Sequence, residues 1–147
     1  MKLLKLYSLF AGSMKDFAKP FKDNENLYNQ AMSFWGKLEN YSIIIVVIFI
    51  VLGLSMAIWY YKPFNNSPGR HYTLKYWLIF LISTFVFTFA VTLGFEYLAV
   101  APKIDGAFLL ETKIALGNAC YATILYFFTS FVWCNWLPTN AYRLFKI

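Results

Sequence analysis

The chain has 147 residues, enough for one domain, and 60% of them are hydrophobic while only 14% are charged. Soluble domains carry about 25% charged residues, so the composition argues against a soluble globular protein. The net charge of +6 rests largely on lysines spread along the chain, which fits phospholipid headgroups better than nucleic acid, so no nucleic-acid partner is expected.

The first twenty residues predict an amphipathic helix. Apolar residues recur there at steps of three and four, and the lysines fall largely on other positions. Pro20 ends the pattern. A basic amphipathic helix is typical of a segment that lies on a membrane surface, although a helix docked on a partner protein would show the same pattern. A signal peptide is disfavoured because Lys5 interrupts a short apolar core and no A-x-A cleavage site follows.

A second amphipathic stretch follows, with Asp23 or Asn24 as its cap and apolar residues along one face as far as Leu38. We therefore treat residues 1–40 as an interfacial or docking segment. The side chains expected to meet the membrane surface or a partner are Lys2, Lys5, Phe10, Phe17, Phe34 and Trp35.

Three long apolar stretches occupy the rest of the chain, at about 41–61, 76–98 and 114–136. Each reaches the ~20 residues that a helix needs to cross a ~30 Å hydrocarbon layer. The alternating T-F-V-F-T-F of the second stretch is also a strand signal, but strands rarely exceed ten residues. The sequence thus predicts an all-α integral membrane protein, in which a three-helix transmembrane domain (41–147) follows the amphipathic segment.

The basic residues indicate an orientation. Eight lie on the side of the N-terminus and five on the opposite side; counted only near the spans, the numbers are four and five. The positive-inside rule applied to the first count predicts a cytoplasmic N-terminus. We expect a multi-pass protein of a bacterial inner membrane.

Two of the spans carry polar residues at every fourth position. Residues four apart lie on one helix face, so each row predicts a seam that faces protein or water. A threonine hydroxyl can bond the carbonyl one turn back. A carboxylate in hydrocarbon is costly, and we expect Glu96 to reach headgroups or to pair with Lys103 or Lys113. The seam residues are Thr84, Thr88, Thr92 and Glu96 in the second span and Asn118, Tyr126 and Ser130 in the third.

Small residues at the same spacing predict close approach of helices. They are Gly53, Ala57, Ala90, Gly94, Ala115 and Ala119. Two interpretations of the seams remain: packing between helices of one chain or of several copies, or a wet path through an oligomer with Glu96 as an acidic ring. We favour packing, because threonine, alanine and tyrosine are common in packing seams.

The sequence predicts no enzyme, no cofactor and no metal site. His71 is its single histidine, and Cys120 and Cys134 both fall in the third span, ~21 Å apart along a helix. No Cys-x-x-Cys or nucleotide-binding motif occurs. A membrane enzyme or small transporter, our third hypothesis, would have to use Glu96, Asp105, Glu111 and Asn118.

Function is predicted only in outline. The leading hypothesis is a small membrane subunit that anchors or scaffolds a larger assembly, such as a secretion or injection machine. Its partners would be the lipid bilayer and other membrane-protein subunits, as a hetero- or homo-oligomer. The alternative is a homo-oligomeric pore or membrane-permeabilising effector, holin-like or defence-associated.

Overall fold

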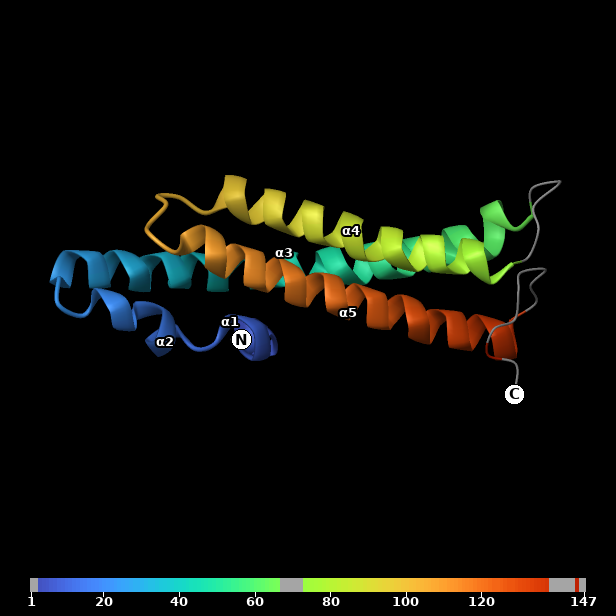
Figure 1. Cartoon of the computed structure of the whole chain (residues 1–147), viewed down its shortest axis with the longest axis horizontal. Coiled ribbons are helices and arrows are strands. Elements are labelled where there is room, and N and C mark those ends of the chain that lie inside the picture. The colour runs from blue at the N-terminus through green and yellow to red at the C-terminus, as the bar shows by residue number, and fades with distance from the viewer. Residues whose placement is uncertain (1–2, 67–72, 138–144, 146–147) are drawn as a thin grey trace. The chain divides into compact units, whose positions relative to one another are not determined.

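The computed structural model describes residues 3–66, 73–137 and 145, and every regular element within these ranges is helical (Figure 1). The predicted all-α class is therefore confirmed for this part of the chain. Lys2 and His71 lie outside it. The elements are η1 (Leu3–Tyr7), α1 (Ser8–Ala11), α2 (Met14–Ala18), η2 (Lys19–Phe21), α3 (Glu25–Trp59), the π-helical turn η3 (Tyr60–Phe64), α4 (Leu74–Ala99) and α5 (Ala107–Trp136).

Three helices are long and apolar enough to cross a membrane, as predicted: Glu25–Phe64, Leu74–Ala99 and Ala107–Trp136. All three begin earlier than the sequence indicated, the second by only two residues. The side-chain oxygen of Asn24 accepts hydrogen bonds from the amides of Asn26 and Leu27 and so caps α3, and no proline follows before residue 63. The second amphipathic stretch and the first span are therefore one helix.

The first amphipathic stretch is broken, which corrects the prediction of a single helix there. Gly12 has a φ of 75°, a conformation that glycine adopts without strain. Ser13 then caps a new helix, α2, by a reciprocal pair of bonds with Asp16. The hydroxyl and backbone N–H of Ser13 hold the pKa of the Asp16 carboxyl below its usual range. We call residues 3–21 the N-terminal arm.

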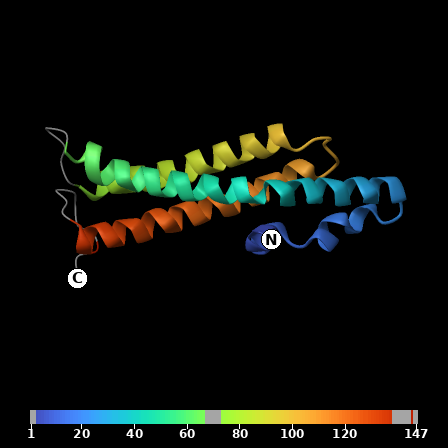
Figure 2. The ribbon, with the colours of Figure 1, turned by 180° about the vertical axis from the view of Figure 1, so that it is seen from behind.

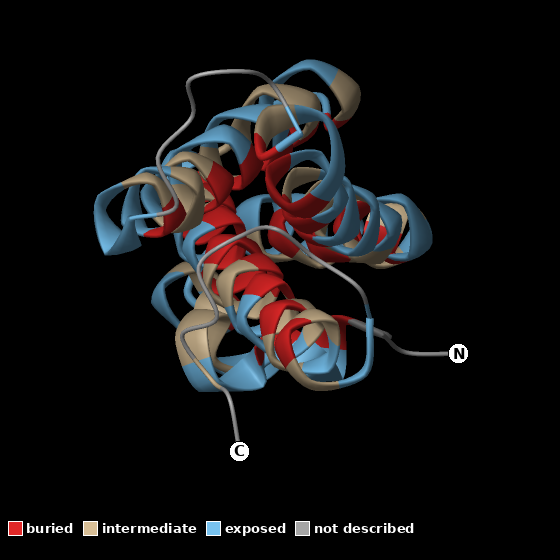
Figure 3. Cartoon of the chain, turned by 90° about the vertical axis from the view of Figure 1, so that its right-hand side faces the viewer, coloured by how far each residue is buried: buried red, intermediate tan, exposed pale blue. Residues whose placement is uncertain are grey.

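The chain contacts divide the protein into two units, residues 1–48 with 89–118 and residues 49–88 with 119–147. Each long helix contributes residues to both. Figure 3 shows that the buried residues of each helix follow one side of it, while the other side is exposed.

In the first unit the N-terminal arm packs against α3. Figures 1 and 2 show it running beside the first part of that helix. The ring of Phe17 lies 6.1 Å from that of Phe34 and 6.0 Å from that of Trp35, measured between centroids. Leu4 and Tyr7 are buried as well. The arm is therefore a folded part of the unit.

The second unit has an aromatic core. Tyr60, Tyr61, Trp77 and Tyr126 are buried together with Ala57 and Cys134. The indole N–H of Trp77 donates to the Ser130 hydroxyl at 3.1 Å. These residues come from α3, η3, α4 and α5, so the core ties the four elements together within this unit.

Gly53 lies close against α5 within the second unit. A Cβ atom there would stand 2.9 Å from the carbonyl oxygen of Ala122 and 3.3 Å from the side chain of Leu125. A Cβ at Gly94, in the first unit, would meet no atom within 4 Å. Each of the two glycines belongs to a pair of small residues four positions apart, Gly53 with Ala57 and Gly94 with Ala90. The atoms that surround the two glycines nevertheless differ.

We expect Gly53→Ala to lower the thermal unfolding midpoint of the detergent-solubilised protein, because overpacking against backbone costs about 1–3 kcal/mol. Gly94→Ala is the matched control. It meets no neighbour and gains about 0.5–1 kcal/mol of helix propensity, so its midpoint should stay unchanged or rise. Tryptophan fluorescence against temperature measures both. Equal midpoints for the two variants would contradict the packing described at Gly53.

Candidate functional site

The side chain of Asn118 joins four segments of the first unit. Its carbonyl oxygen accepts a hydrogen bond from the Tyr7 hydroxyl at 2.6 Å. Its amide group donates to the backbone carbonyl of Ile45 at 3.0 Å and to the Thr92 hydroxyl at 2.7 Å. Asn118 is fully buried, so these bonds replace the hydrogen bonds to water that its amide group loses on burial. The arm, α3, α4 and α5 thus meet at one side chain.

The residue before Asn118 lets the arm come close. A Cβ at Gly117 would stand 2.8 Å from Cδ2 of Phe10 and 3.1 Å from Cδ1 of Tyr7. Any larger residue at position 117 would therefore push the two rings outward. Glycine here brings the Tyr7 hydroxyl within reach of Asn118.

A second polar cluster in the same unit contains two carboxyl groups and one ammonium. The ammonium of Lys103 forms a salt bridge with Glu111 and donates to the backbone carbonyl of Glu96 at 3.3 Å. It also lies 4.9 Å from the ring centroid of Tyr97. Glu96 and Glu111 are fully buried. The expected pairing of the Glu96 carboxyl with Lys103 is corrected: Lys103 bonds the Glu96 backbone, and its carboxylate partner is Glu111.

The Glu96 side chain remains without a partner among the described residues. Neither of its carboxyl oxygens has a hydrogen bond, and neither does Oε2 of Glu111. Burying an unpaired polar group costs about 1–3 kcal/mol by protein mutational data. No set of three or more His, Cys, Asp or Glu side chains arranged for a metal ion occurs in the described ranges. Glu96, Lys103 and Glu111 form the most polar interior cluster that the first unit offers.

The other seam residues are also interior. Thr84 donates to the carbonyl oxygen of Phe80 at 2.8 Å, and the Thr88 hydroxyl has no partner within the described part of the chain. In the second unit the Tyr126 hydroxyl donates to the carbonyl oxygen of Trp77 at 3.4 Å. The seam residues with no exposed surface are Thr84, Thr88, Thr92, Glu96, Asn118, Tyr126 and Ser130.

The small residues divide into two groups. Gly53, Ala57, Ala115 and Ala119 are buried. Ala90 is exposed and Gly94 half-buried, and a Cβ at Gly94 would meet no atom of the described residues within 4 Å. Close packing of a helix against Ala90 and Gly94 stays a prediction, and it would need a helix from another molecule.

The predicted docking residues are also divided. Lys5 is exposed, while Phe10 and Phe17 are half-buried. Phe34 and Trp35 are buried, with Phe17 of the arm against them. In this conformation the chain itself covers the two side chains on which a partner was expected to dock.

Sequence reasoning did not identify Tyr7 and Trp77 as partners of the seam residues. Tyr7 is 111 positions from Asn118, and Trp77 is 53 positions from Ser130. Residue spacing reports only neighbours on one helix, so it carries no signal for such pairs. The one available hint was the hydroxyl of Tyr7 within an apolar helix face.

Tyr7→Phe should release the arm. The variant keeps the ring but leaves the Asn118 carbonyl oxygen without its donor. This should destabilise the docked arm by about 1–3 kcal/mol and raise the rate of cleavage within it roughly tenfold or more. Limited trypsin digestion at Lys15 and Lys22 measures this opening. Tyr97→Phe, at an exposed tyrosine, is the control and should leave the cleavage rate unchanged. Equal rates for both variants would show that the hydroxyl does not hold the arm.

Glu96→Gln and Glu111→Gln form a second matched pair. Glu111→Gln removes the carboxylate that accepts from Lys103, so we expect a loss of about 1–3 kcal/mol in the free energy of unfolding. Glu96→Gln breaks no side-chain hydrogen bond, and the change should stay below about 1 kcal/mol. Denaturant titration in detergent micelles compares them. A larger loss for Glu96→Gln would mean that its carboxyl group has a partner.

Comparison with known proteins found no matching family model, no similar curated protein and no similar solved structure. What the chain does is therefore inferred from its own residues and contacts.

Proposed function

We propose that this chain is a three-pass integral membrane protein that anchors or scaffolds a larger membrane assembly. Insertion is supported by the outer faces of α3, α4 and α5, where large apolar side chains such as Ile43, Val86 and Phe128 are more than half exposed. An exposed apolar surface of this extent is what a bilayer would cover. The polar seam residues are buried, as helix packing in lipid favours.

The observation that carries the anchoring role is the folded N-terminal arm. Tyr7 fixes it to Asn118, and Phe17 fixes it to α3. Its lysines, Lys5, Lys15 and Lys19, are exposed, as is Lys22 just after it. The arm therefore presents a basic surface in a fixed position beside the apolar spans. Such a surface suits lipid headgroups together with an acidic face of another subunit.

The pore alternative is less well supported. A pore built from several copies needs polar side chains on the surface where the copies meet. The threonine row and Glu96 are buried within the single chain instead. They would have to become exposed before they could line a path.

The proposed location is a bacterial inner membrane with the N-terminus in the cytoplasm, as the larger count of basic residues on that side favours. Lys15→Cys and Asn66→Cys test this orientation in a chain whose Cys120 and Cys134 are alanine. A membrane-impermeant maleimide applied to intact cells should label only the cysteine at position 66. Labelling at position 15 instead would reverse the orientation.

The anchoring role predicts a particle larger than the 17.2 kDa chain and its detergent micelle. Extraction in a mild detergent, followed by light scattering on the eluted particle and identification of its components, should give other proteins in fixed ratio. Lys15→Glu, Lys19→Glu and Lys22→Glu together should reduce the mass to that of the single chain, because they reverse the charge of the exposed basic surface.

The control carries Lys62→Glu and Lys75→Glu, two exposed lysines of the second unit. This variant should keep the full mass. A particle of the single chain in the unmodified protein would contradict the anchoring role. A particle that contains only copies of this chain and resists the arm substitutions would favour the pore.

A further inference from the structure

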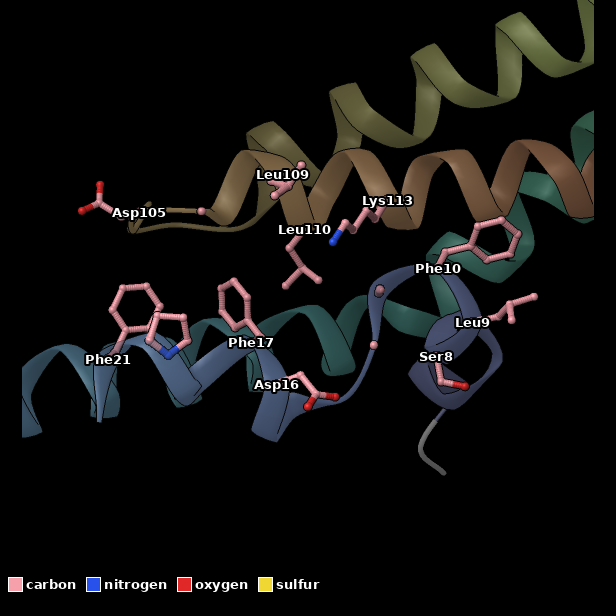
Figure 4. Close-up of a pocket in the computed structure, with 14 residues that line it drawn as sticks. Ser8, Leu9, Phe10, Asp16, Phe17, Phe21, Asp105, Leu109, Leu110 and Lys113 are labelled. Atoms are coloured by element: carbon pink, nitrogen blue, oxygen red, sulfur yellow. The ribbon is translucent and has the colours of Figure 1, made fainter. Parts of the chain in front are cut away.

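A groove of about 550 Å³ lies between the N-terminal arm and the beginning of α5, within the first unit. This is within the ~300–1,000 Å³ typical of ligand pockets. Figure 4 shows Leu110 and Lys113 pointing from α5 toward the arm, and Phe17 and Phe21 pointing from the arm toward α5. The groove is mostly apolar, with a few charged groups along its walls.

The charged groups of the groove are one ammonium and two carboxylates. Lys113 is exposed, and no described residue forms an ion pair or hydrogen bond with it. Asp16 and Asp105 also line the groove and are exposed. The groove can therefore contact both negative and positive groups of a ligand. A ligand that carried only negative charge would meet two carboxylates and one ammonium group.

The chemistry is arranged in order along the groove. Phe10 lies at one end, where it packs over Gly117. Lys113 comes next, one residue before the predicted third span, and Phe17 with Phe21 lies farther from that span (Figure 4). From the membrane outward the wall is apolar, then cationic, then aromatic, and Asp105 lies at the outer end (Figure 4). A phospholipid with an ammonium headgroup has its acyl chain, phosphate and ammonium in the same order.

We propose that this groove binds a zwitterionic phospholipid whose headgroup ends in an ammonium. The acyl chain lies against Phe10, the phosphate accepts from Lys113, and the ammonium is held near the rings of Phe17 and Phe21, at the end of the groove where Asp105 lies. Phosphate–ammonium pairs and cations over aromatic faces are both favourable contacts. This inference rests on the membrane insertion proposed above and not on the anchoring role.

An anionic phospholipid fits the groove less well. It would gain the contact with Lys113, but its headgroup would find no partner for Asp16 or Asp105. The exposed lysines of the arm attract anionic lipids in general, so a preference for the zwitterionic lipid is the property that separates the groove from the surrounding basic surface.

The test compares phosphatidylethanolamine with phosphatidylglycerol of the same acyl chains. Each is added to the purified full chain in detergent, and native mass spectrometry counts the lipid retained. The unmodified protein should retain phosphatidylethanolamine preferentially. Lys113→Gln should weaken this retention about tenfold, the effect of one lost charge-assisted hydrogen bond. Phe21→Leu should weaken it severalfold, because the ring face is lost while the apolar contact stays.

Lys15→Gln is the control, because Lys15 is exposed on the arm and does not line the groove. It should retain phosphatidylethanolamine as the unmodified chain does. Equal retention of the two lipids, or a loss shared by Lys113→Gln and Lys15→Gln, would overturn the proposal in favour of general lipid attraction. Membrane fractionation of the same variants tests insertion separately, so a chain that inserts but retains no lipid would disprove the groove alone.

Discussion

The first unit depends on how one buried amide is satisfied. Asn118 has one acceptor and two donor hydrogens inside an apolar helix, and leaving them unpaired there would cost several kcal/mol in total. The structure uses a tyrosine from the arm, a carbonyl of α3 and a threonine of α4 to satisfy them. Apolar packing between helices is weakly directional, whereas these bonds fix one register. Asn118 thus specifies which faces meet, and Gly117 provides the space for the arm to reach it.

The acidic cluster follows a different principle. Lys103 has one carboxylate partner, Glu111, and two buried carboxyl groups lie near it. The Lys103 side chain is about one-third exposed, so the pair lies at the boundary of the unit where a lysine can keep contact with water. Glu96 gains only a backbone contact from Lys103. Asn118 therefore accounts for the register of the helices in this unit. Glu96, by contrast, is a buried polar residue of the same unit whose carboxyl group has no hydrogen bond that would explain its place there.

Composition and periodicity were sufficient to predict the helical class, the three apolar helices and the spacing of the buried seams. Both signals are local: ~20 apolar residues define a span, and a four-residue repeat defines a face. They could not predict that the arm breaks at Gly12, because a glycine inside an amphipathic pattern is compatible with a continuous helix as well as with a turn. Nor could they find the partner of Asn118, because Tyr7 lies at the other end of the sequence. The absence of any helix breaker around residues 39 and 40 was a usable signal for the continuous α3, and it was missed.

The folded arm also changes how the docking residues should be interpreted. Phe34 and Trp35 looked like an exposed apolar face only because the sequence does not show what packs on them; in the structure Phe17 does. By covering these rings, the arm exposes its own lysines and forms one wall of the groove beside α5. The surface available to other molecules is therefore created by the arm in its docked position. Because the Tyr7–Asn118 bond contributes to that position, the same interaction that fixes the helix register also sets which surface the protein presents to other molecules.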